Sequence, residues 1–155
     1  MAGIFERQVL RPSQLYAVAE KRFGDAKALC DTQDNERANG AMYLCGFVIE
    51  ILLKARLVQL GASATKIQRD VPPAEKKVSQ LIWKSHNLVE MLAELPLVEA
   101  TVKKAGERSG KPLEQWLKDI CKTWTIYARY SSRSATIADA RLMLDRVRQL
   151  KEILK

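Results

Sequence analysis

A glutamate and a lysine lie within the most apolar stretch of the chain, "ANGAMYLCGFVIEILLKARL". Glu50 and Lys54 are four residues apart, so a helix places them on one face with the glutamate first, the favourable order for an ion pair. Burying charge is costly unless the charge is paired. The spacing therefore has two interpretations: a half-exposed ion pair at the edge of the core, or a charged pair held in a functional groove.

His86 is the only histidine of the chain and lies in the segment "SHNLVEML". Histidine readily changes its protonation near neutral pH, which makes it a candidate general base. No cysteine or carboxylate partner is evident from its position in the sequence. Asn87 and Glu90 have the spacing of a capping box, which predicts a helix start and makes His86 the residue before the cap. Two interpretations of His86 therefore stay open: a functional role, or a polar side chain at a helix end.

A third candidate group is the arginine-rich and aromatic segment "WTIYARYSSRS". Arg129 and Arg133 offer guanidinium groups for phosphate, and Tyr130 or Trp124 offers a ring on which a base can stack. The competing interpretation makes the two aromatic residues part of the core or of an interface. Arg129 would then complement the dipole at a helix end.

Other common chemistries have no support in the sequence. The three cysteines, Cys30, Cys45 and Cys121, are widely spaced in apolar runs and make no metal-binding motif. They are interpreted as buried free thiols. There is no glycine-rich phosphate loop, dinucleotide fingerprint, HExxH or GxSxG motif. We therefore expect neither a metal nor a cofactor.

The segments that must position these residues all have a helical period, and none shows sustained alternation. Thr136 and Asp139 have the spacing of a capping pair for the last helix. The pattern predicts an all-α protein, an antiparallel bundle of four main helices with one or two short ones. The length of 155 residues suits a single domain, residues 1–155, with residues 1–12 as an N-terminal extension.

Charge and hydropathy narrow the choice of partners. Lysine and arginine number 26 against 18 acidic residues, a net charge of +8, which favours an anionic partner such as a nucleotide, a nucleic acid or an acidic protein. The longest mostly apolar run, residues 41–53, is shorter than the ~20 residues that span a bilayer. No signal sequence is evident. We expect a cytoplasmic protein with no membrane partner.

Together, four segments resemble the HEPN domain family. "ANGAMYLCGFVIEILLKARL" is similar to the family's second helix, and "SHNLVEML" to its His-(Asp/Asn)-Leu element. "IYARYSS" resembles the later Arg-Tyr step, and an amphipathic helix follows it. Carried over by position, the family's recurring polar residues match Glu50, Lys54, His86, Arg129 and Tyr130. The resemblance covers about residues 13–155.

The resemblance implies a small helical bundle, often a homodimer, that binds RNA or a nucleotide. It also implies, as a partner, a minimal nucleotidyltransferase or an antitoxin in a toxin–antitoxin or defence system. Ribonuclease members carry an arginine followed by four to six residues and a histidine. Here Arg129 is followed by "YSSRSATIAD", with no histidine.

The expected function is therefore a non-catalytic HEPN-like domain that binds a nucleotide or RNA through Arg129, with Lys54 as a second charge. A helical dimerisation or protein-interaction module is one alternative, because arginine and aromatic residues are also frequent at interfaces. A metal-independent ribonuclease that uses His86 and Arg129 is the other.

Overall fold

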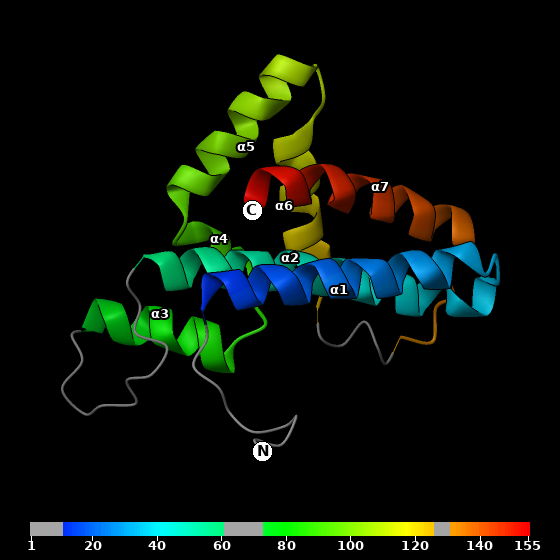
Figure 1. Ribbon diagram of the computed structural model, residues 1–155, viewed down its shortest axis with the longest axis horizontal. Helices are drawn as coiled ribbons and strands as arrows, with labels where there is room; N and C mark the ends of the chain where they lie inside the picture. The colour runs from blue at the N-terminus through cyan, green and yellow to red at the C-terminus, as the bar shows by residue number, and fades with distance from the viewer. Residues whose placement is uncertain (1–10, 61–72, 126–130) are drawn as a thin grey trace.

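The structure, a computed structural model, describes residues 11–60, 73–125 and 131–155. These residues form an all-α bundle, and no strand occurs within the three ranges (Figure 1). The expected fold class is confirmed. The helices are α1 (Pro12–Asp31), α2 (Ala38–Gln59), α3 (Pro73–Lys84), α4 (Leu88–Ala93), α5 (Pro96–Ser109), α6 (Leu113–Thr123) and α7 (Ile137–Leu154), with a 3₁₀ turn at Asn35–Arg37.

Helix α2 is the centre of the bundle. It contacts α1, α3, α4 and α7, which explains why its apolar residues are not confined to one stripe. Its fully buried large side chains include Val48, Ile49, Leu52, Leu53 and Leu57. Helices α1 and α2 form an antiparallel pair, as do α5 and α6, whereas α7 runs parallel to α2 (Figure 1).

The ends of several helices follow from local chemistry. The Asn87 side chain accepts a hydrogen bond from the Glu90 amide at 3.2 Å and caps α4 as predicted. Thr136 and Asp139 form a complete capping box at the start of α7. Pro12 and Pro96 stand in the first turns of α1 and α5, where a missing amide hydrogen costs nothing.

One glycine allows α6 to end against α2. A Cβ atom at Gly46 would lie 1.9 Å from Cδ1 of Trp124, so only glycine leaves room for the indole ring. Trp124 directly follows α6, and its Nε1 donates a hydrogen bond to the Tyr43 carbonyl at 3.0 Å. This contact fixes where the chain leaves α6, next to the first half of α2.

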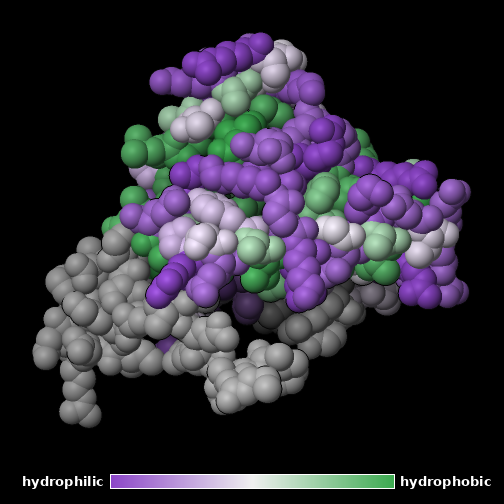
Figure 2. All heavy atoms as spheres, viewed as in Figure 1, coloured by the Kyte–Doolittle hydropathy of each residue, from purple (hydrophilic) through white to green (hydrophobic). Residues whose placement is uncertain are grey.

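The surface is largely polar. Hydrophilic side chains cover much of the face formed by α1 and α7 (Figure 2). Among the described residues, no helix is both long enough and apolar enough to cross a membrane.

Candidate functional site

Glu50, Lys54 and His86 come together as one cluster. Oε1 of Glu50 accepts hydrogen bonds from Lys54 Nζ at 2.7 Å and from His86 Nδ1 at 2.9 Å. Lys54 reaches Glu50 from the next turn of α2, whereas His86 reaches it from the link between α3 and α4. The structure thus unites three of the six predicted site residues and gives His86 the carboxylate partner that was not evident from the sequence.

The cluster is buried on one side and open on the other. The Glu50 side chain is 1% exposed, Lys54 is 14% exposed and His86 is 44% exposed. The idea of a half-exposed ion pair is therefore wrong for Glu50, whose carboxylate lies inside the core with its charge compensated by Lys54. Its second oxygen, Oε2, has no hydrogen-bond partner among the described residues.

The contact with Glu50 also orients the imidazole. A neutral histidine that donates from Nδ1 has its acceptor at Nε2, and the carboxylate favours that tautomer. Because nearly half of the His86 side chain is exposed, the ring can meet a solute while its other nitrogen stays bonded to Glu50. This arrangement suits either proton transfer or a hydrogen bond to a ligand.

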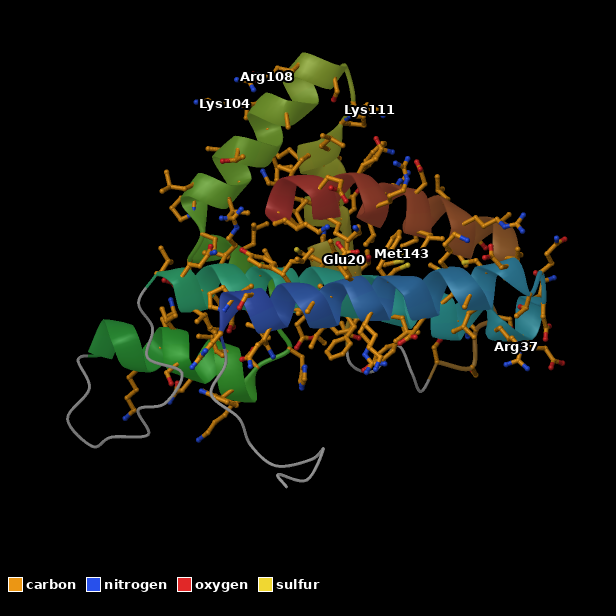
Figure 3. The ribbon with its side chains drawn as sticks, in the orientation of Figure 1. Glu20, Arg37, Lys104, Arg108, Lys111 and Met143 are labelled. Atoms are coloured by element: carbon orange, nitrogen blue, oxygen red, sulfur yellow. The ribbon has the colours of Figure 1, made fainter. Side chains whose placement is uncertain are left out.

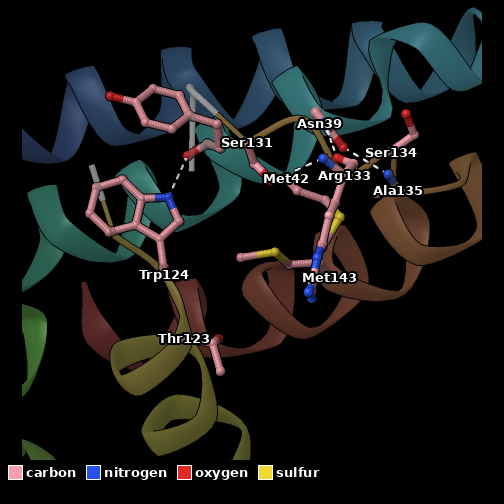
Figure 4. Close-up of a pocket in the computed structure, with 10 residues that line it drawn as sticks. Asn39, Met42, Thr123, Trp124, Ser131, Arg133, Ser134, Ala135 and Met143 are labelled. Atoms are coloured by element: carbon pink, nitrogen blue, oxygen red, sulfur yellow. Dashed lines mark hydrogen bonds between the residues drawn. The ribbon is translucent and has the colours of Figure 1, made fainter. Parts of the chain in front are cut away.

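A separate pocket of about 340 Å³ lies at the other end of α2 (Figure 4). Its lining combines the rings of Tyr43 and Trp124, whose centroids are 5.6 Å apart, with the exposed side chain of Arg133. Trp124 is only 6% exposed, so it offers little of its surface, and Tyr43 is less deeply buried. The volume lies within the usual range for small-molecule sites.

Two asparagines hold the wall that carries Arg133. Asn39 donates from Nδ2 to the Arg133 carbonyl at 2.7 Å and accepts from the Ala135 amide at 2.8 Å. Asn35 accepts from the Ile137 amide at 2.8 Å. These bonds attach the segment before α7 to the start of α2, so the backbone of Arg133 is fixed while its guanidinium makes no hydrogen bond or ion pair with the described residues.

The pocket and the buried cluster lie along the same face of α2. Asn39, Tyr43, Gly46 and Glu50 follow one another at spacings of four, three and four residues. At 1.5 Å per residue, Glu50 is roughly 10 Å along the axis from Tyr43, and Trp124 covers the turn between them. Of the predicted residues that the structure describes, Arg133 and Trp124 line the pocket, whereas Lys54 and His86 are bonded to Glu50 outside it.

The remaining two predicted residues, Arg129 and Tyr130, lie outside the described residues. Sequence reasoning did not identify Asn39 or Tyr43 as pocket residues. A signal was present, since both are polar residues on one face of a very apolar helix.

The thiols do not add a reactive group. All three cysteines are free and buried. Burial raises the pKa of Cys45 and of Cys121 to about 12, so both are protonated thiols at neutral pH. No group of three or more His, Cys, Asp and Glu side chains within the described ranges is placed to hold a metal ion.

Comparisons of this chain with family models, curated proteins and solved structures found no match. The candidate site is therefore argued from its own geometry.

Proposed function

We propose that this chain is a HEPN-like domain that binds a nucleotide or RNA without catalysing a reaction. The observation that carries the proposal is the pocket beside Tyr43, where the guanidinium of Arg133, which has no partner among the described residues, lies at the edge of a cavity lined by aromatic and polar side chains. The guanidinium can bind a phosphate, and the aromatic cavity can hold a base. The net charge of +8 would favour the approach of such an anion.

The buried cluster supports the family part of the proposal. Glu50, Lys54 and His86 are three of the positions on which the HEPN resemblance rests. In the fold, Lys54 and His86 both bond to the carboxylate of Glu50. In this proposal the cluster anchors the start of α4 to α2 and leaves binding to the pocket. A homodimer and a partner from a toxin–antitoxin or defence system belong to the same proposal through the resemblance.

A binding titration at low salt tests the proposal. We expect CMP, AMP or a short single-stranded RNA to bind, and Arg133→Ala to weaken binding about 10-fold or more, since a charge-assisted hydrogen bond contributes roughly 1.5–3 kcal/mol. Arg108→Ala is the matched control, because this exposed residue lies at the far end of α5 (Figure 3). Absence of binding, or equal effects of the two variants, would contradict the proposal.

The contact between His86 and Glu50 favours a second candidate, a metal-independent ribonuclease. A carboxylate that orients an exposed imidazole is a common arrangement for a general base. This function predicts RNA cleavage in EDTA that His86→Ala abolishes and Arg108→Ala leaves unchanged.

A protein-interaction module instead predicts co-purification with a protein partner and no nucleotide binding.

A further inference from the structure

A second cavity lies next to the pocket beside Arg133. A space of about 310 Å³ lies between the end of α6 and the first half of α7. Four residues line both spaces: Met42, Thr123, Ala135 and Met143. The two cavities are therefore neighbours that share these four residues, and we call the pair of cavities the base groove.

Arg133 lines the first cavity and is not among the residues that line the second. Its backbone belongs to the wall of the first cavity, and its side chain extends toward Met143, one of the shared residues (Figure 4). A phosphate bound to this guanidinium would thus lie close to a residue that both cavities share. A mononucleotide has a base on only one side of its phosphate, whereas a dinucleotide has one on both.

The two cavities differ in charge. Among their described lining residues, the first cavity has no acidic side chain, whereas the second has Asp119 and Asp139. Asp139 Oδ2 accepts from the amide and the hydroxyl of Thr136, and these bonds lower the pKa of Asp139 and keep it ionised. Its role as a cap for α7 makes it a poor choice for substitution.

Asp119 is the freer acceptor. It is exposed, and its Oδ1 accepts one hydrogen bond, from Gln115 at 2.7 Å. Its other oxygen is not bonded to any described residue. The cation that lines this cavity is Arg146. Its Cζ lies 5.4 Å from the centroid of the Trp116 ring, so one face of the guanidinium is already covered by the indole. A carboxylate is a suitable acceptor for the exocyclic amino group of cytosine or adenine.

Resting on the proposed function, we infer that the base groove takes a two-nucleotide step of single-stranded RNA. The phosphodiester bonds to Arg133, and one base occupies the cavity beside Tyr43. The other base occupies the second cavity, where Asp119 selects a base with an exocyclic amino group. The ligand is therefore an RNA strand with cytosine or adenine at that position rather than a free mononucleotide.

Dinucleoside monophosphates test this inference, because their only phosphate is the internal one. We expect CpC to bind about 10-fold tighter than either CMP or UpU, the effect of one good additional hydrogen bond. Asp119→Ala should bring the affinities for CpC and UpU within about 3-fold of each other. Asp25→Ala is the matched control, because it removes the same charge from a partly exposed side chain on α1 and should leave the preference unchanged.

The outcomes separate the two proposals. If CMP binds but CpC is no tighter, the two-nucleotide inference is wrong and the proposed function stands. If CpC and UpU bind equally to the unaltered protein, Asp119 does not select the base. If none of these ligands binds, the proposed function fails together with the inference. Circular dichroism of each variant checks that the fold is intact.

Discussion

The contact between Gly46 and Trp124 gives a prediction whose sign can be worked out from the structure. In Gly46→Ala the new methyl group would lie 1.9 Å from Cδ1 and 2.2 Å from Nε1 of the indole. Ordinary contacts of a Cβ atom begin near 3.4 Å, so the ring must retreat by about 1.5 Å. The Tyr43 carbonyl lies on the same helix as Gly46, so a ring that retreats from α2 stretches its hydrogen bond to that carbonyl.

The size of the effect follows from two destabilising contributions and one stabilising contribution. Overpacking a tight contact costs about 1–3 kcal/mol, and loss of the indole hydrogen bond costs about 1 kcal/mol. Alanine returns about 1 kcal/mol through its better helix propensity. We expect a net loss of about 1–3 kcal/mol in the free energy of unfolding, which for a chain of this length corresponds to a fall in Tm of about 2–12 °C.

Urea unfolding followed by circular dichroism measures this effect, and Gly24→Ala on α1 is the control. Gly24 is also helical, but a Cβ there would meet nothing within 4 Å. Gly24→Ala should therefore stabilise the protein by about 0.5–1 kcal/mol. The reasoning is refuted if Gly46→Ala is as stable as Gly24→Ala, because the indole would then have moved without cost.

Three further predictions concern charge and burial. Glu50→Ala leaves a lysine and a histidine without their shared acceptor and should cost about 3 kcal/mol in urea unfolding; a loss below about 1 kcal/mol would contradict this. The pKa of Glu20 is lowered first by its hydrogen bond to Lys151. The unfolded state thus binds more protons, so this stabilisation is present above pH 4.5 and is lost as the pH falls through the folded-state pKa. Glu20→Gln should flatten that acid-side dependence of the urea midpoint, and an unchanged slope would argue against the ion pair. Because Cys45 and Cys121 are buried with a pKa of about 12, a thiol reagent should label them only in denaturant, and rapid labelling of the native protein would be the opposite result.

Local rules were enough to predict the helical framework. The caps at Asn87 and Thr136 depend on residues three positions apart, and the pair of Glu50 and Lys54 on residues four apart. Such patterns are set by the geometry of one helix, so they can be found in a single sequence.

The site depends on contacts that no local rule contains. His86 meets Glu50 across 36 residues, and Trp124 meets Tyr43 across 81. Which helices bring such residues together depends on packing of the whole bundle. The sequence could indicate that Glu50 is unusual, but not that its partner would be the only histidine, nor that a second cavity with Asp119 would adjoin the first.

The wall fixed by Asn39 and Asn35 has a consequence for the dynamics of the molecule. Its three hydrogen bonds join residues 94 to 102 positions apart, all within or just before the first turns of α2 and α7. Only these few bonds need to break for the wall to open locally, without unfolding of the helices. The amides of Ala135 and Ile137 should therefore exchange with solvent faster than those inside α2. A ligand in the base groove should slow that exchange, which would make hydrogen exchange at two amides a direct record of occupancy.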